Sequence, residues 1–293
     1  GTVSGTPGEL GDFQVLVTAT DNVGNKTTSN FQITVEDKTG PVIVSIPDKT
    51  LPEDQLIDSI GVSVTDNYDP APTITITGLP DGLSYNKTTG AIEGTPATPG
   101  AYTVTVTATD AANNPSTITF KITVLDKTGP VFGSITAKTF PADQAITNFT
   151  ITATDLYSPP ASISITGLPS GLSASAGTVS GTPIQVGDFT IQVTATDAVG
   201  NTSSTSFNLT IEDKTPPSIT PIGDKLYKMG AQITAIAVSA MDTYSLPVSV
   251  QVNDLPVGLS FSNGEITGTP TVEGSYPVTV LATDAAGNPN SFI

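Results

Sequence analysis

The chain has 293 residues without cysteine, histidine or tryptophan, and its ten cationic residues are all lysines. These absences exclude Cys-His and Ser-His-Asp nucleophiles and histidine-ligated zinc, and since carboxylates are the only general bases left we expect no enzyme. The net charge of −17 argues against nucleic acid or anionic membrane surfaces as partners and favours cations. No stretch approaches the roughly 20 apolar residues of a membrane span, so we expect no membrane insertion.

A motif made of a strand end and a turn recurs four times along the chain. The string VTATDAANN begins at Val106, and close variants surround Asp21, Asp197 and Asp284. The aspartates of the four copies are 89, 87 and 87 residues apart, which is the length of one small β-sandwich module. The chain is therefore predicted to be a tandem array.

Alignment of the copies predicts the module boundaries. We expect a partial module at residues 1–36, complete modules at 37–125 and 126–212, and a fourth module at 213–293 that lacks most of its last strand. The string GTVSGTP at the start matches GAIEGTP at residues 90–96, so we expect the chain to open in the middle of a module, at strand E. These four segments are called the first segment and the second, third and fourth modules below.

Apolar and polar residues alternate with a period of two, and no helical apolar period occurs, so the fold class is predicted to be all-β. The alternation is clear after Ala101, where Tyr102, Val104 and Val106 face the core while threonines face solvent. In the second module the seven strands, A to G, are predicted near residues 42–46, 57–65, 73–77, 83–86, 91–93, 101–110 and 116–124.

Three strings in each module carry a resemblance to a known family. In the second module GLPDGLS begins at Gly78, TGAIEGTP begins at Thr89, and GAYTVTVTATD begins at Gly100 and leads into the repeated turn. This combination resembles the bacterial "putative Ig" repeat family and the related dystroglycan-type cadherin-like modules, and it covers both complete modules. The resemblance implies Ig-like or cadherin-like sandwiches arranged end to end, as in the stalks of bacterial surface adhesins.

Acidic residues follow the strands that end at one pole of each module. With seven antiparallel strands, the start of the module, the B–C loop and the F–G loop lie at the same pole. In the second module these places carry Asp37, Asp66 and Asp110. We therefore expect the three carboxylates to converge.

The opposite pole of the preceding module would face this cluster. Its A–B loop carries Glu53 and Asp54 in the second module and Asp143 in the third. The candidate metal ligands are Asp21, Glu36, Asp37, Glu53, Asp54, Asp66, Asp110, Asn114, Asp126, Asp143, Asp155, Asp197, Asn201, Glu212, Asp213, Asp242, Asp284 and Asn288.

Carboxylates brought this close repel one another unless they are protonated, solvated or bridged by a cation. Oxygen ligands without histidine or cysteine favour Ca²⁺ over zinc or copper, so the sequence predicts Ca²⁺ at the module joints. The arrangement is similar to cadherin, and the shorter linker string DKT implies fewer ions or weaker binding than in that family. By this resemblance Asp37, Asp126 and Asp213 match the linker position, and Asp66, Asp155 and Asp242 match the position that ends strand B, with Asp69 as a further nearby acid in the second module.

Two observations leave a purely structural interpretation open. Aspartate and asparagine after a strand also form ordinary turns through Asx hydrogen bonds. Lys38, Lys127 and Lys214 lie beside the linker aspartates and could neutralise part of the charge, which counts against a metal.

A tyrosine lies two residues after the strand-B aspartate in each module, at Tyr68, Tyr157 and Tyr244. Packing against the joint is favoured over stacking on a sugar, although a flat apolar ring suits both.

The predicted function is a structural stalk of a bacterial cell-surface adhesin, which would be cell-wall anchored or secreted. Short proline-containing linkers and bound Ca²⁺ would hold neighbouring repeats of the stalk in a semi-rigid array. A host-surface glycan or protein would then bind to a tip domain elsewhere in the parent protein. The alternatives are modules that themselves bind glycan or host protein, or accessory repeats of a large secreted enzyme.

Overall fold

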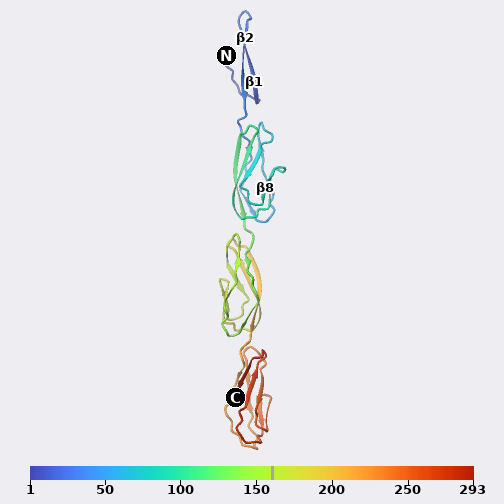
Figure 1. The fold of residues 1–293 in the computed structure, drawn as a ribbon, viewed down its shortest axis with the longest axis vertical. Helices are drawn as coiled ribbons and strands as arrows, with labels where there is room; N and C mark the ends of the chain where they lie inside the picture. Colours follow the sequence, from blue (N-terminus) through green and yellow to red (C-terminus); the bar gives the residue numbers. More distant parts are fainter. Residues whose placement is uncertain (160–161) are drawn as a thin grey trace. The chain divides into compact units, whose positions relative to one another are not determined.

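The computed structural model describes residues 1–159 and 162–293 as strands joined by turns (Figure 1). The all-β prediction is confirmed. Within the described residues, no helix has the length and apolar character needed to cross a bilayer. The chain divides into two compact units, Gly1–Lys127 and Thr128–Ile293.

The first unit begins with a hairpin and continues with a sandwich. The hairpin pairs β1 (Gly11–Thr20) with β2 (Lys26–Val35) in antiparallel register. The strands of the second module are β3 (Val42–Ile43), β4 (Lys49–Pro52), β5 (Ile60–Gly61), β6 (Val64–Thr65), β7 (Thr73–Thr77), β8 (Leu83–Asn86), β9 (Ala91–Gly94), β10 (Gly100–Thr109) and β11 (Pro115–Leu125).

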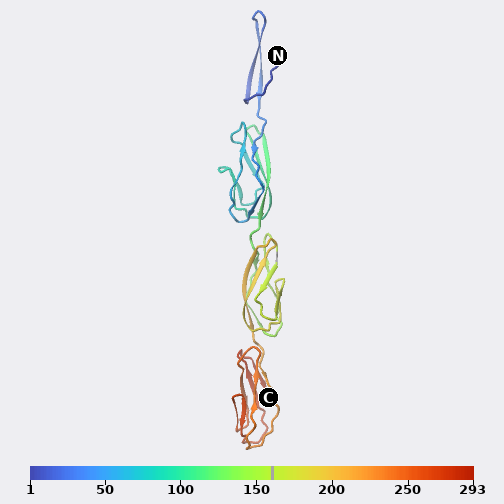
Figure 2. The same cartoon turned by 180° about the vertical axis from the view of Figure 1, so that it is seen from behind.

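Two sheets form the layers of the second module, as the view from behind also shows (Figure 2). One sheet has the order β4-β11-β10-β7, the other has the order β5-β9-β8, and β3 pairs with β6. The alternation of β10 places Val104 and Val106 fully inside, between the layers. Burying each of these side chains contributes roughly 1.5–3 kcal/mol.

The strands differ from the prediction in three places. The predicted strand B is split into β5, which pairs with β9, and β6, which pairs with β3. The chain changes partner here, because the Val62 N–H donates to the Gly90 carbonyl oxygen whereas the Ser63 carbonyl oxygen accepts the Val44 N–H. The predicted A–B loop contains β4, which runs parallel to β11, so the strands are not all antiparallel. The strand expected near residues 1–7 is not formed, since its counterpart β9 pairs with β5 and β8 and the first segment contains no equivalents of these strands.

The second unit contains two further sandwiches of the same design. The strands of the third module are β12 (Val131–Phe132), β13 (Lys138–Pro141), β14 (Phe149–Thr150), β15 (Ala153–Thr154), β16 (Ser162–Thr166), β17 (Leu172–Ser175), β18 (Thr178–Gly181), β19 (Gly187–Thr196) and β20 (Thr202–Glu212). Those of the fourth are β21 (Ser218–Ile219), β22 (Ile236–Ala237), β23 (Ala240–Met241), β24 (Ser249–Asn253), β25 (Leu259–Ser262), β26 (Glu265–Gly268), β27 (Thr279–Thr283) and β28 (Pro289–Phe292).

The third module repeats the sheet orders of the second, with β13 again parallel to the last strand, β20. In the fourth module the larger sheet is reduced to β24-β27-β28, without an equivalent of β13 among its described residues. Each of the three modules encloses its own cluster of buried apolar side chains, whose members include Ile122, Leu209 and Ile266 respectively. The candidate sites lie at the poles of these sandwiches.

Candidate metal centre

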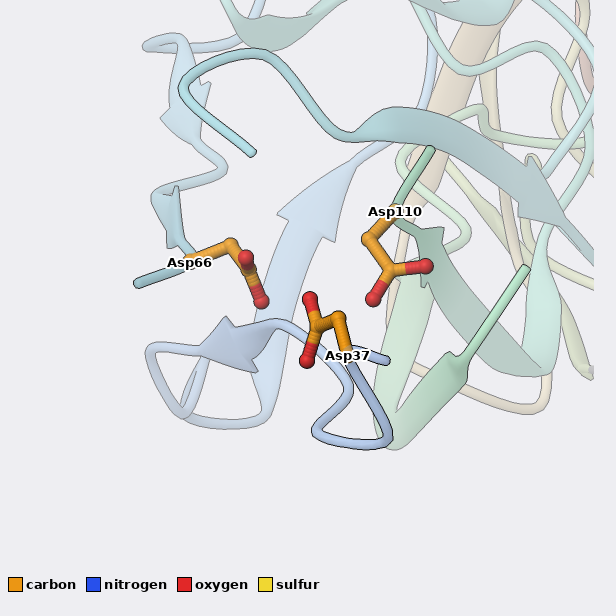
Figure 3. Close-up of side chains that lie close together, drawn as sticks. All are labelled: Asp37, Asp66 and Asp110. Atoms are coloured by element: carbon orange, nitrogen blue, oxygen red, sulfur yellow. The ribbon is translucent and has the colours of Figure 1, made fainter. Parts of the chain in front are cut away.

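Three aspartates of the second module meet at one pole (Figure 3). Asp37 follows β2 at the start of the linker, Asp66 directly follows β6, and Asp110 directly follows β10. Each offers one carboxylate oxygen, and the three oxygens lie within 4.8 Å of one another. Asp37 and Asp110 are only 8% and 5% exposed. The convergence expected from the strand order is therefore present.

The register of the strands explains why these positions meet. Val42 at the start of β3 pairs with Thr65 at the end of β6, which brings Asp66 beside the incoming linker. Thr109 at the end of β10 pairs with Pro115 at the start of β11, which places Asp110 at the same pole.

Asp110 also closes the turn between β10 and β11. Its Oδ1 accepts a hydrogen bond from the backbone N–H of Asn114 and its Oδ2 accepts one from Asn114 Nδ2, both at 2.7 Å. Burial acts to raise the pKa of Asp110, but the backbone and side-chain hydrogen bonds from Asn114 outweigh it and hold the pKa below its usual value. Asn114 Nδ2 also lies 3.3 Å from the Asp37 carbonyl oxygen, and so connects the turn to the linker.

Asp66 is the member of the set whose contacts are incomplete. Its Oδ1 accepts backbone hydrogen bonds from Tyr68 at 2.9 Å and Asp69 at 2.8 Å. Its Oδ2 is buried and has no hydrogen-bond partner among the described residues. Since a buried polar atom left unsatisfied costs about 1–3 kcal/mol, this oxygen fits a cation that would complete its coordination.

Asp37 and Asp69 hold the surrounding loops. Asp37 Oδ1 accepts hydrogen bonds from the Thr39 N–H at 2.9 Å and the Thr39 hydroxyl at 2.7 Å, which curls the linker around the carboxylate. Asp69 Oδ2 accepts the Ala111 N–H at 2.9 Å. Asp69 thus braces the B–C loop against the F–G loop.

The hairpin shows the same turn without the other acids. Asp21 Oδ1 accepts the N–H groups of Val23 and Asn25 at 3.0 and 2.8 Å, and its Oδ2 accepts Asn25 Nδ2 at 2.8 Å. Asp21 is exposed and belongs to no group of three acids in the described part of the chain. Turn formation therefore explains the contacts of Asp110 itself, but it does not explain the convergence of three carboxylates or the buried Asp66 Oδ2.

The fourth module repeats the set with Asp213, Asp242 and Asp284, again with ligand oxygens within 4.8 Å of one another. The Ser245 hydroxyl donates a hydrogen bond to Asp213 Oδ2. Burial acts to raise the pKa of Asp213, but hydrogen bonds, led by those from the Ser245 and Thr215 hydroxyls, outweigh it and lower the pKa.

Asn288 repeats the connection between turn and linker, with its Nδ2 at 2.8 Å from Asp284 Oδ2 and 3.3 Å from the Asp213 carbonyl oxygen. The hydroxyls of Ser245 and Thr215, which donate to Asp213, were not predicted from the sequence. Thr215 lies in the repeated DKT string, and this repetition is a signal that could have indicated its role.

The corresponding acids Asp126, Asp155 and Asp197 do not all belong to one unit. Asp126 belongs to the end of the first unit and the other two belong to the second. Asp197 closes its turn through Asn201 as Asp110 does through Asn114, with distances of 2.7 Å to the Asn201 N–H and Nδ2. Asp155 Oδ1 accepts the Tyr157 N–H at 2.9 Å, as Asp66 does with Tyr68.

The linker glutamates and lysines pair with each other. Lys38 Nζ lies 2.7 Å from Glu36 Oε2, and Lys214 Nζ lies 3.1 Å from Glu212 Oε2. Neither Glu36 nor Glu212 belongs to the grouped acids of the described residues. In these two linkers the lysines therefore form ion pairs with glutamates, and no ion pair with the grouped aspartates is found among the described residues.

The acids predicted at the opposite pole have separate roles. Glu53 is 1% exposed, and its Oε1 accepts the Lys127 N–H at 2.7 Å, so it holds the linker that leaves the second module. Asp54 and Asp143 are exposed residues with φ of +52° and +57°. Asp143 accepts a hydrogen bond from the Tyr244 hydroxyl at 2.9 Å.

Comparisons with known proteins agree with this architecture. The family described as "Putative Ig domain" matches residues 40–125, 129–212 and 215–292. Over 166 residues, or 56% of the chain, the sequence is 40% identical to the "Serine-rich adhesin for platelets" of Staphylococcus aureus strain USA300, and the matched part is 7% of that protein. The same protein of strain MRSA252 is 40% identical over 166 residues, which are 12% of its length.

Among solved structures, cadherin domains 1–4 of Protocadherin Gamma B7 match with a TM-score of 0.47 and 18% identity, covering 96% of this chain and 81% of that one. Domains EC21–23 of human CDH23 match with a TM-score of 0.44 and 16% identity, covering 86% of this chain and 99% of that one.

Proposed function

Because the chain belongs to the Putative Ig domain family, we propose that its tandem modules form a stalk in a bacterial surface adhesin, stiffened by Ca²⁺ bound at the module joints. The similarity to the staphylococcal adhesin supports the adhesin part of this proposal. The matched region is a small fraction of that relative, which fits a repeated spacer better than a unit that carries the whole activity.

The calcium part rests on one observation above the others. Asp66 Oδ2 is buried and lacks a hydrogen-bond donor among the described residues. Asp66 also belongs to a group with two further aspartates, whose ligand oxygens lie within 4.8 Å of one another. Ca²⁺ takes 6–8 oxygen ligands in flexible geometry, so carboxylates together with backbone carbonyls and water suit it. A bound cation would neutralise the repulsion among Asp37, Asp66 and Asp110.

Stiffening would follow from where these ligands lie in the chain. Asp37 and Asp213 belong to linkers, whereas Asp110 and Asp284 belong to turns within the following module. One ion held by both would fix the direction in which the linker enters that module. Short linkers with proline already restrict the backbone, so a small number of added contacts limits bending further.

Small-angle scattering of the whole chain tests the proposal. We expect the maximum dimension to increase when Ca²⁺ replaces EDTA, and the effect to be lost in a variant with Asp66→Asn, Asp155→Asn and Asp242→Asn. Each asparagine keeps the Oδ1 acceptor of its loop and removes one negative charge. Unchanged scattering with and without Ca²⁺ would show that the ion does not stiffen the stalk.

A further inference from the structure

Tyr244 belongs to the fourth module but packs on the third. It lies in the loop between β23 and β24, beyond the strand that ends with Met241. Its ring packs against the apolar core of the third module, whose buried members include Ala142 and Ile211. Its hydroxyl donates a hydrogen bond to Asp143 Oδ1 at 2.9 Å. The contact therefore combines an apolar ring with a charged acceptor.

The acceptor is held in a fixed turn of the third module. Asp143 follows β13 with φ of +57°, a conformation uncommon for residues other than glycine. Its N–H donates to the Pro183 carbonyl oxygen at 2.8 Å, and the neighbouring Ala142 N–H donates to the Glu212 carbonyl oxygen at 2.9 Å. These bonds anchor the turn beside the exit of β20, so the carboxylate is placed before the next module meets it.

The donor is held by the acidic set of the fourth module. The N–H groups of Tyr244 and Ser245 both donate to Asp242 Oδ1 at 2.8 Å. The Ser245 hydroxyl reaches Asp213 Oδ2. The loop that presents the tyrosine is therefore folded around two members of the candidate metal centre.

We propose that Tyr244 is the residue that seats the fourth module on the third, with Asp143 as its acceptor, and that cation binding by Asp213, Asp242 and Asp284 tightens this seating. The docking surface is the pole of the third module, and its partner is the tyrosine-bearing loop of the next module. The coupling to the cation rests on the function proposed above, whereas the docking contact does not.

The corresponding tyrosine of the second module and the corresponding acceptor position of the fourth module differ from this pair. Tyr68 is presented by the same loop, with its N–H on Asp66 Oδ1 at 2.9 Å, but its side chain is 47% exposed. Gly230 occupies the acceptor position in the fourth module, with φ of +77° and its N–H on the Pro270 carbonyl oxygen at 2.8 Å.

The test uses the whole chain with spin labels on an introduced cysteine pair, Asn208→Cys and Gln251→Cys. Both positions are exposed, and the absence of native cysteine makes labelling specific. Tyr244→Phe removes the hydroxyl alone. Asp143→Gly removes the acceptor and suits the positive φ, as Gly230 does in the fourth module. Tyr68→Phe is the matched control.

We expect a narrow inter-label distance distribution in the unmodified chain with Ca²⁺. Tyr244→Phe and Asp143→Gly should each raise the undocked population about tenfold, the effect of losing one hydrogen bond to a charged group. The double variant should add little, because both changes remove the same bond. Tyr68→Phe should have no effect.

The outcomes separate docking from coupling. A distribution that is unchanged by Tyr244→Phe and Tyr244→Ala, with or without Ca²⁺, would overturn the docking role. If calorimetry shows Ca²⁺ binding but the distribution in the unmodified chain does not narrow, the coupling is wrong while the calcium centre stands. If calorimetry shows no binding, the calcium proposal and the coupling fail together, and broadening by Tyr244→Phe in EDTA still supports docking.

Discussion

Replacing Asp66 by asparagine separates the metal interpretation from the turn interpretation. The asparagine Oδ1 can keep the backbone hydrogen bonds from Tyr68 and Asp69, so the loop should stay folded. In place of the buried Oδ2 the variant has an NH₂ group, which can donate to the neighbouring carboxylates. Without Ca²⁺ the variant should therefore be more stable than the unmodified chain, and with Ca²⁺ it should lose the stabilisation by the ion.

The magnitude follows from the geometry of the set. Two unit charges 4.8 Å apart repel by roughly 1 kcal/mol at the dielectric constant of water and roughly 3 kcal/mol at an effective value of 20. We therefore expect a gain of at least about 1 kcal/mol without the ion, or about 4–8 °C in melting temperature for a module of this size. For dissociation constants of about 10⁻⁴–10⁻³ M, 10 mM Ca²⁺ should stabilise the unmodified module by about 1.4–2.7 kcal/mol.

The assay is thermal unfolding followed by NMR signals of the second-module core residues Val104 and Val106, recorded in EDTA and in Ca²⁺. Asp81→Asn is the matched control, since it removes the same charge from an exposed position of the same module. An equal response to Ca²⁺ in the unmodified chain and in Asp66→Asn would refute the metal role of this carboxylate. A large loss of stability for Asp66→Asn in EDTA would show instead that the full carboxylate serves the turn.

Three further predictions concern the turns and the acidic sets. Asp110→Asn and Asp21→Asn should each weaken their turn, so the amide hydrogens of both turns should exchange faster by a similar factor. Only Asp110→Asn should lower the calcium affinity measured by calorimetry, because only Asp110 has acidic neighbours in a described set of three. The pKa values of Asp110 and Asp213 are lowered in the folded chain, so the stability that they contribute is complete above about pH 5 and is lost as the pH falls further. Acid unfolding monitored by circular dichroism should show this as a flat region followed by a decline. Gly171→Ala should destabilise the third module by more than about 3 kcal/mol in denaturant unfolding, whereas Gly200→Ala should cost only about 1–2 kcal/mol. Both glycines have positive φ, but a Cβ on Gly171 would lie 1.9 Å from the Thr182 carbonyl oxygen, whereas a Cβ on Gly200 would meet nothing within 4 Å. Equal costs for the two glycine substitutions would contradict the packing at that corner.

The strands that could be predicted are those whose signal is local. Thr73–Thr77 has the predicted bounds, and Val104 and Val106 are buried as the alternation indicates. A period of two is a property of consecutive residues, so it needs no knowledge of the partner strand. The convergence of Asp37, Asp66 and Asp110 could be predicted too, because it depends only on strand order.

The features that could not be predicted depend on partners distant in sequence or on side-chain rotamers. Lys49–Pro52 forms a strand because it pairs in parallel with the end of β11, and its own residues, which end in proline, do not indicate this. The pairing of Lys38 with Glu36 depends on side-chain rotamers. The hydrogen bond from Tyr244 to Asp143 joins positions 101 residues apart, and only the packing of the tyrosine against the joint could be anticipated.

The central claim is that the acidic sets at the module poles bind Ca²⁺, and a calcium titration of the chelator-treated chain by calorimetry tests it most directly. We predict saturable binding that becomes weaker in Asp66→Asn and is unaffected by Asp81→Asn. The absence of a saturable heat at millimolar Ca²⁺, or an identical isotherm for the unmodified chain and Asp66→Asn, would contradict it.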